Sequence, residues 1–188
     1  MKMTAIPSIA CLAVIGKDNN PLHVTIFPST AQPTPILTPL QTSFLLSSTL
    51  DVFHARSVAN HTTGVGLSGD YGLLHAIDER LAAYGYETNT AVRFVAIVDF
   101  RGRLISPDQQ TGAGTDGRAG GMGMRDGELK AVFRSMQSAY IRLLQNPFYD
   151  PDEHVVKEGR GGKRITSRRF IEDIRRIGEQ WIPESMAV

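Results

Sequence analysis

The sequence predicts an α+β domain in which helices pack on a five-stranded antiparallel sheet, in the order ββ-α-βββ-α-α. Short apolar runs separated by tight turns occur in two groups, one near the N-terminus and one in the middle of the chain. A helical pattern of apolar residues lies between the two groups, and two further helical patterns follow the second group. The length of 188 residues fits a single domain over residues 1–188.

The first two strands form a predicted hairpin. Residues 8–15 are an apolar run rich in β-forming residues, and residues 22–27 are a second such run. The cluster DNNP at residues 18–21, which lies between them, is typical of a turn. The two strands are therefore expected to pair with each other.

The first helix is predicted to begin at Thr38 and Pro39, because a capping hydroxyl followed by proline is typical of a helix start. Leu46, Leu50 and Phe53 recur at i, i+4 and i+7 along this helix. This spacing places all three on one side, which predicts a single buried face.

Three more strands are predicted at residues 71–77, 81–87 and 92–98. The connections between them are tight turns at residues 78–80 and 89–90. Turns this short join antiparallel neighbours, so the three strands are expected to form a meander.

The second and third helices are predicted from apolar residues at helical spacing. The second has a continuous face formed by Leu129, Val132, Phe133, Met136, Tyr140, Leu143 and Leu144, and ends before Pro147. The third has a face formed by Phe170, Ile174, Ile177 and Trp181, and ends before Pro183. Segments rich in glycine, proline or charge are expected to be flexible insertions at about 28–37, 61–70, 101–125 and 154–165.

The segment GAGTDG at residues 112–117 matches the G-x-G-x-x-G pattern of dinucleotide-binding turns. In such a turn the first glycine directly follows a strand and the last opens a helix, so that helix amides face the pyrophosphate. Here the predicted strand ends about a dozen residues earlier, near Asp99, and the helix begins only near Asp126. The flanking strands are also predicted to be antiparallel, so the segment is interpreted as an insertion and not as a nucleotide site.

No catalytic residue, metal site or cofactor site is predicted. The histidines are scattered, with no i, i+4 pair and no carboxylate at metal-ligand spacing; they are His23, His54, His61, His75 and His154. Cys11 is the single cysteine and is expected to be a small core residue in an apolar strand. The net charge of +1 gives no general reason to expect nucleic acid as a partner.

Two short motifs have both a functional and a structural interpretation. Basic residues gather before the last helix, which fits contact with an acidic protein or an anionic membrane surface but is more often a solvated loop. They are Lys157, Arg160, Lys163, Arg164, Arg168 and Arg169. Asn146-Pro147-Phe148 matches a tripeptide that certain endocytic adaptor domains bind. Because it directly follows a buried helix, Phe148 and Tyr149 are expected to fold back onto the core.

Several blocks of the sequence, in the same order, resemble the sedlin-like subunit of the transport protein particle complex (TRAPP). They are CLAVIGKDNNPLHVTIF near the N-terminus, the helical STLDVF, the meander YGYETNTAVRFVAIVD, and LLQNPFYDPDE. The agreement of separate blocks makes the resemblance specific. The longer proline, glycine and basic loops depart from the compact animal members and indicate a fungal one.

The resemblance implies a longin-like (SNARE-like) fold with the element order derived above. It also implies a non-catalytic adaptor or assembly subunit of TRAPP, which tethers vesicles and exchanges guanine nucleotide on Rab GTPases in ER-to-Golgi and intra-Golgi transport. The expected partners are other TRAPP subunits and, indirectly, Rab GTPases, in the cytoplasm and peripherally on Golgi membranes. The alternative is a stand-alone longin regulatory domain that binds SNAREs or small GTPases, although no SNARE heptads follow Trp181.

The resemblance also indicates one interface residue. In sedlin-like proteins an aspartate of the first helix, in a motif of the type LDV, belongs to a surface that faces a neighbouring subunit, and it corresponds to Asp51 here. Asp51 lies roughly 100° around the helix from Leu50. It is therefore expected beside the buried face but off it. The other interpretation is a solvated aspartate without a partner.

Overall fold

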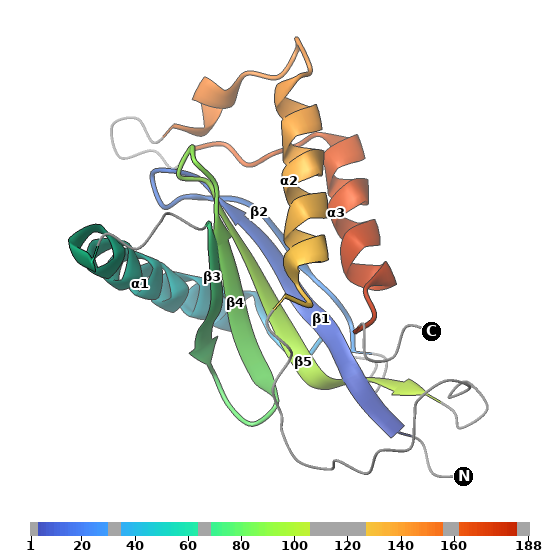
Figure 1. The fold of residues 1–188 in the computed structure, drawn as a ribbon. Coiled ribbons are helices and arrows are strands. Elements are labelled where there is room, and N and C mark those ends of the chain that lie inside the picture. The colour runs from blue at the N-terminus through green and yellow to red at the C-terminus, as the bar shows by residue number, and fades with distance from the viewer. Residues whose placement is uncertain (1–3, 30–34, 64–68, 106–126, 156–161, 184–188) are drawn as a thin grey trace.

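The computed structural model describes residues 4–29, 35–63, 69–105, 127–155 and 162–183. Within these residues the predicted order of strands and helices is confirmed, and a short 3-10 helix precedes the last helix (Figure 1). The strands are β1 (Thr4–Ile15), β2 (Pro21–Ile26), β3 (Asp70–Ala76), β4 (Leu81–Glu87) and β5 (Arg93–Ile105). The helices are α1 (Pro39–Thr63), α2 (Lys130–Leu144), η2 (Pro151–His154) and α3 (Arg168–Gln180).

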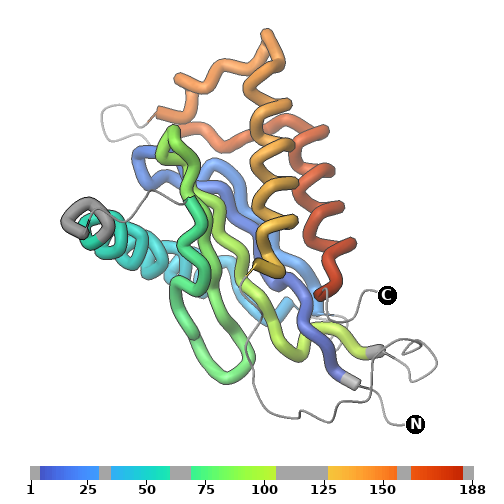
Figure 2. The backbone as a smooth tube through the Cα atoms, viewed as in Figure 1, coloured from blue at the N-terminus to red at the C-terminus, as the bar shows by residue number. Residues whose placement is uncertain are grey.

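The five strands form one antiparallel sheet in the order β2-β1-β5-β4-β3. The hairpin β1–β2 and the meander β3–β4–β5 are both present as predicted. They join through β1 and β5, which run side by side although they are far apart in sequence (Figure 2). Leu12 pairs with Ala96 and Val14 with Phe94 in this central ladder. The pairing turns two local motifs into a single sheet.

The sheet is buried on both faces, because α1 covers one face and α2 and α3 cover the other (Figure 1). Side chains alternate between the two faces along a strand. In β5, Phe94, Ala96 and Val98 pack toward α2 and α3, whereas Val95 and Ile97 pack toward α1. Two-sided burial explains why the central strands read as continuous apolar runs and not as alternating ones.

The two central strands are longer than predicted. β1 begins at Thr4 and not at residue 8, and β5 continues to Ile105 and not only to residue 98. The extra residues pair with each other, with Ala5 opposite Leu104. The predicted insertion at 101–125 was therefore placed too early, since its first residues belong to the sheet. GAGTDG lies outside the described residues.

Parts of the other predicted insertions also belong to the fold. The segment 61–70 begins inside α1, which continues to Thr63, and it ends at the first residue of β3. In the segment 28–37, Leu37 is buried against the α1 side of the sheet. In the segment 154–165, Ile165 is buried and its N–H donates to the carbonyl of Leu22. Leu37 and Ile165 therefore attach two of these segments to the core. Composition alone did not indicate these contacts.

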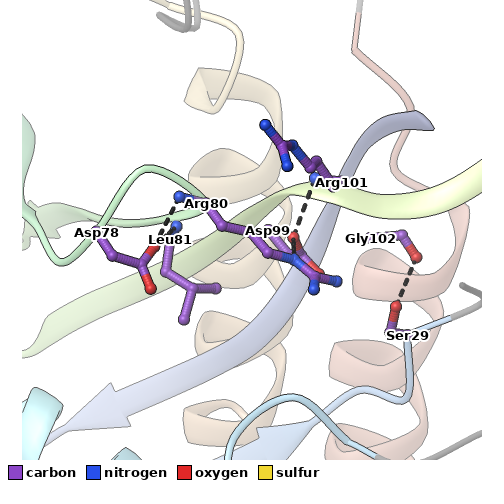
Figure 3. A network of polar contacts seen from close by, with 7 residues as sticks. All are labelled: Ser29, Asp78, Arg80, Leu81, Asp99, Arg101 and Gly102. Atoms are coloured by element: carbon purple, nitrogen blue, oxygen red, sulfur yellow. Dashed lines mark hydrogen bonds and ion pairs between the residues drawn. The ribbon is translucent and has the colours of Figure 1, made fainter. Parts of the chain in front are cut away.

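A buried ion pair fastens the β3–β4 turn to the middle of β5 (Figure 3). The Asp99 side chain accepts from Arg80 Nε at 2.6 Å and from Arg80 Nη2 at 2.7 Å. Asp99 also accepts from the N–H of Arg101, and this ion pair raises the pKa of Arg80. Asp78 Oδ1 accepts from the N–H groups of Arg80 and Leu81, which shapes the turn itself. The carboxylate of Asp99 is thus satisfied although it is almost fully buried.

Candidate subunit interface on helix α1

The histidines that the sequence analysis considered as candidate site residues lie on different elements of the fold. His23 lies in β2, His54 in α1, His75 in β3 and His154 in η2. Over the described ranges, no group of three or more His, Cys, Asp or Glu could hold a metal ion. Cys11 is fully buried in β1, as predicted, and burial raises the pKa of its thiol to about 12. A thiol with that pKa stays protonated near neutral pH and is a poor nucleophile.

Helix α1 begins after Thr38, as the sequence indicated, and Thr38 and Gln41 form a capping box there. Gln41 Oε1 accepts from the N–H of Thr38 at 2.9 Å, and the N–H of Gln41 donates back to Thr38 Oγ1 at 3.3 Å. This reciprocal pair satisfies backbone donors that the first helical turn would otherwise leave unpaired. These two hydrogen bonds stabilise the first turn of α1.

The inner face of α1 packs on the sheet through the predicted apolar residues. Phe53 is fully buried and Leu46 is nearly so, while Leu50 is half-buried at the edge of the contact. Thr42 and Thr49 are also buried, and their hydroxyls donate to helix carbonyls at 3.0 and 2.7 Å. These internal hydrogen bonds allow two polar residues to face the core without an unpaired group.

The outer face of α1 carries a second apolar row, which the sequence analysis missed. Leu40 is 67% exposed, Phe44 is 68% exposed and Val58 is 52% exposed. With about 100° per residue, these three and Asp51 fall within about 40° of one another, on the side opposite Phe53. A surface helix usually has one apolar side facing the core. The outer row, defined here as Leu40, Phe44, Asp51 and Val58, is therefore a candidate for contact with another protein.

Asp51 lies in the middle of the outer row. It is exposed, and it is seven residues from both Phe44 and Val58, about 10 Å along the helix in each direction. Its carboxylate forms no ion pair or hydrogen bond with the part of the chain that the structure describes. The prediction that Asp51 lies off the buried face is consistent with this exposure. The carboxylate is available to a partner.

A groove of about 410 Å³ runs beside the N-terminal half of α1, between this helix and the strands β1 and β2. Its apolar lining comes from Ile15, Pro21, Val24, Ile26, Pro39, Leu46 and Leu50, and its polar lining includes Thr42, Ser43, Ser47 and Arg164. Ser43 and Ser47 lie between the groove and the outer row around the helix. The groove and the outer row therefore form one continuous surface.

The basic residues before α3 are partly neutralised by neighbours. Lys163 Nζ lies 3.2 Å from Glu153, and Arg168 Nε lies 2.8 Å from Glu172. These pairs are exposed and contribute little to stability. Arg164 lines the groove beside α1, whereas Lys157 and Arg160 lie outside the described residues.

The expectation for Phe148 was wrong. Its side chain is 95% exposed, whereas Tyr149 packs partly buried against the core as predicted. Phe148 lies inside the turn Asn146–Tyr149 and faces solvent, whereas the Tyr149 hydroxyl lies 2.6 Å from Nε2 of the buried His154.

The antiparallel sheet, with α1 on one face and α2 and α3 on the other, defines a longin-like α+β domain, and the outer face of α1 carries exposed apolar side chains. The family described as Sedlin matches residues 14–180, so the chain belongs to the Sedlin family.

The chain is similar to proteins named Trafficking protein particle complex subunit 2-like protein, and three of them are described here. That of Mus musculus is 29% identical over 161 residues, which cover 85% of this chain and 89% of the relative. That of Dictyostelium discoideum is 26% identical over 168 residues, covering 88% and 93%. That of Xenopus tropicalis is 27% identical over 146 residues, covering 77% and 86%. The similarity therefore extends over most of both chains.

In the described part of the chain, the helices are too short or too polar to cross a membrane.

Proposed function

We propose that this protein is a non-catalytic assembly subunit of a trafficking protein particle (TRAPP) complex, and that it docks on a neighbouring subunit through the outer row of α1. The relatives' names support membership of the complex. The single observation that carries the docking surface is the exposed row itself, with large apolar side chains on the side of α1 that faces away from the core.

The outer row combines large apolar side chains with one central carboxylate, as interfaces between proteins often do. Burying a large apolar side chain contributes about 1.5–3 kcal/mol, so Leu40 and Phe44 supply affinity once a partner covers them. Asp51 at the centre can accept charge-assisted hydrogen bonds from a lysine or arginine of the partner. Such a charge inside an apolar contact fixes orientation and selects among partners. The role of Asp51 in this contact is therefore one of positioning and specificity.

Within the complex the chain acts as an adaptor, and guanine-nucleotide exchange on Rab GTPases belongs to other subunits. In this role the protein is recruited peripherally to Golgi and ER–Golgi membranes as part of the complex. The dispersed histidines and the protonated Cys11 fit a role without chemistry of its own.

A stand-alone longin domain that binds SNAREs or small GTPases is the second candidate, and the groove beside α1 favours it. Most of the residues that line the groove are apolar. The groove also borders β2, which is an edge strand of the sheet. An edge strand with an apolar groove can accept an extended or helical peptide. The two candidates differ in which proteins co-purify with the chain.

The experiment is affinity purification of the tagged full chain with mass spectrometry, comparing wild type with Asp51→Tyr. The substitution removes the carboxylate and places a bulky ring in the centre of the outer row. Recovery of the other TRAPP subunits is expected to fall at least tenfold, which corresponds to about 1.4 kcal/mol. Stability of the isolated chain is expected to change by no more than about 0.5 kcal/mol, since Asp51 is exposed.

Glu179→Tyr is the matched control, because Glu179 is an exposed acidic residue on α3, on the other face of the sheet. It should leave recovery unchanged. Recovery of SNAREs or GTPases without TRAPP subunits would support the second candidate. Equal recovery of the complex by wild type and Asp51→Tyr would remove Asp51 from the interface.

A further inference from the structure

The residues Asn146 to Tyr149 form a tight turn at the end of α2, where the chain leaves the upper end of that helix in Figure 1. The N–H of Tyr149 donates to the carbonyl of Asn146 at 3.0 Å, and the N–H of Phe148 donates to Asn146 Oδ1 at 3.2 Å. Pro147 has a fixed φ that suits the second position of such a turn. The backbone of the tripeptide Asn-Pro-Phe is therefore already folded.

Both ends of the turn are attached to the fold. Before it, α2 packs on the sheet through its buried face. After it, Tyr149 packs partly buried on the core, and its hydroxyl lies 2.6 Å from Nε2 of the buried His154. The carboxylate of Asp150 then caps η2 by accepting from the N–H of Asp152 at 2.9 Å. The turn is held in place from both sides.

Phe148 gains nothing for folding from this arrangement. Its side chain is 95% exposed, the highest value among the exposed large apolar residues of the described ranges. A fully exposed phenylalanine on a fixed turn costs solvation without contributing to the core. Ile141 and Leu144 on the last turns of α2 are also 45% and 42% exposed.

The sequence that follows the turn is acidic. Asp150 and Asp152 are exposed within five residues of Phe148, and the neighbouring Glu153 pairs with Lys163 at 3.2 Å. A partner with cations around its binding pocket would be attracted to this segment, and a partner with an acidic rim would be repelled. Charge thus restricts the kind of domain that can receive the ring.

We propose that the turn Asn146–Tyr149 is a preformed binding motif for a second protein, with Phe148 entering an apolar pocket surrounded by cations. The pocket chemistry is that of the adaptor domains that bind Asn-Pro-Phe tripeptides. A flexible peptide loses entropy when it folds into a turn on binding, and a preformed turn avoids most of that cost. The motif lies on the α2 side of the sheet, so it can be occupied while α1 contacts a neighbouring subunit (Figure 1).

The test measures binding of the full chain to an isolated adaptor domain known to bind Asn-Pro-Phe peptides, by isothermal titration calorimetry. Phe148→Ala is expected to weaken binding at least tenfold, as for a buried aromatic anchor at an interface. Its melting temperature should match wild type, because the side chain it removes is exposed. Phe44→Ala is the matched control, an exposed phenylalanine in α1, and should bind as wild type does.

A synthetic peptide of residues 145–153 provides the comparison with an unfolded motif. The full chain is expected to bind at least as tightly as the peptide. Failure of the full chain to bind, with or without binding by the peptide, overturns the proposal. So does binding that Phe148→Ala leaves unchanged. Loss of TRAPP subunits from purified Phe148→Ala protein would also overturn it, because the ring would then belong to the assembly of the complex itself.

Discussion

At the scale of single residues, Asp99 and Arg80 form a bidentate ion pair with hydrogen bonds of 2.6 and 2.7 Å. The Asp99 side chain is 2% exposed and the Arg80 side chain 27%, so one partner is buried and the other reaches solvent. The two hydrogen bonds of this bidentate pair connect the β3–β4 turn to β5 (Figure 3). Planar, bidentate geometry of this kind gives both strength and orientation.

Asp99→Asn should destabilise the protein by about 2–4 kcal/mol. Breaking a buried pair commonly costs about 3–5 kcal/mol, and the partial exposure of Arg80 reduces that cost. The amide keeps the size of the side chain but faces the guanidinium with a donor group. Urea denaturation of the isolated chain measures the change. A loss below about 1 kcal/mol would show that the ion pair contributes little to the stability of the fold.

Residue-level prediction succeeded for most of the expected core residues and failed for Phe148 and Leu144. Cys11, Leu46 and Phe53 are buried as expected, because their apolar neighbours recur at the period of a strand or a helix. Phe148 and Tyr149 have similar character and adjacent positions, and only the turn geometry decides which one faces the core. That geometry depends on the hydrogen bond that Asn146 Oδ1 accepts from the N–H of Phe148, and the pattern of apolar residues does not indicate it.

At the scale of elements, α2 is the helix whose sequence pattern matched its packing best. Val132, Phe133, Met136, Tyr140 and Leu143 are buried, while Leu144 is partly exposed beyond the end of that face. Phe133 is 3% exposed and stacks with Tyr86 of β4 at 6.0 Å between ring centroids. It therefore links α2 to the sheet.

Phe133→Ala is expected to destabilise the isolated chain by about 3–5 kcal/mol, the usual cost of removing a buried aromatic ring. Thermal and denaturant unfolding measure it. Arg134→Ala, which changes the exposed neighbour on the same helix, should stay within about 0.5 kcal/mol. If both variants had similar, small effects, the buried face of α2 would be misassigned.

Helix α1 shows why the sequence analysis indicated only Asp51 among the residues of the outer row. Its inner face follows from the spacing of Leu46 and Phe53, and the family resemblance indicates Asp51. The residues Leu40, Phe44 and Val58 are at i, i+4 and i+18, a signal that was present in the sequence but spread over five turns. An apolar row opposite another apolar row does not give an amphipathic pattern, so the outer face was not recognised.

At the scale of the whole molecule, the order of elements was predictable but the order of strands in the sheet was not. Tight turns specify the hairpin and the meander, because each turn joins neighbours in sequence. The contact of β1 with β5 depends on two segments separated by α1 and three other strands. The extension of both strands to Thr4 and Ile105 follows from that contact and from no local signal.

The two faces of the sheet give the molecule two separate surfaces. α1, which carries the outer row, lies on one side, and the end of α2, which the turn with Phe148 follows, lies on the other (Figure 1). An adaptor that connects one partner to another needs such separation, because both contacts must form at the same time. The proposed role as an assembly subunit therefore depends first on the contact at α1.

Site-specific photo-cross-linking tests that contact most directly. A photoreactive amino acid replaces Phe44 in the outer row, or Arg134 on the exposed side of α2 as the control, and both proteins are expressed in cells that contain the complex. Cross-linked peptides from a neighbouring TRAPP subunit are expected from position 44, at a yield several-fold above position 134. Recovery of the intact complex with no subunit cross-linked at position 44 would contradict the assignment of α1 as the docking surface.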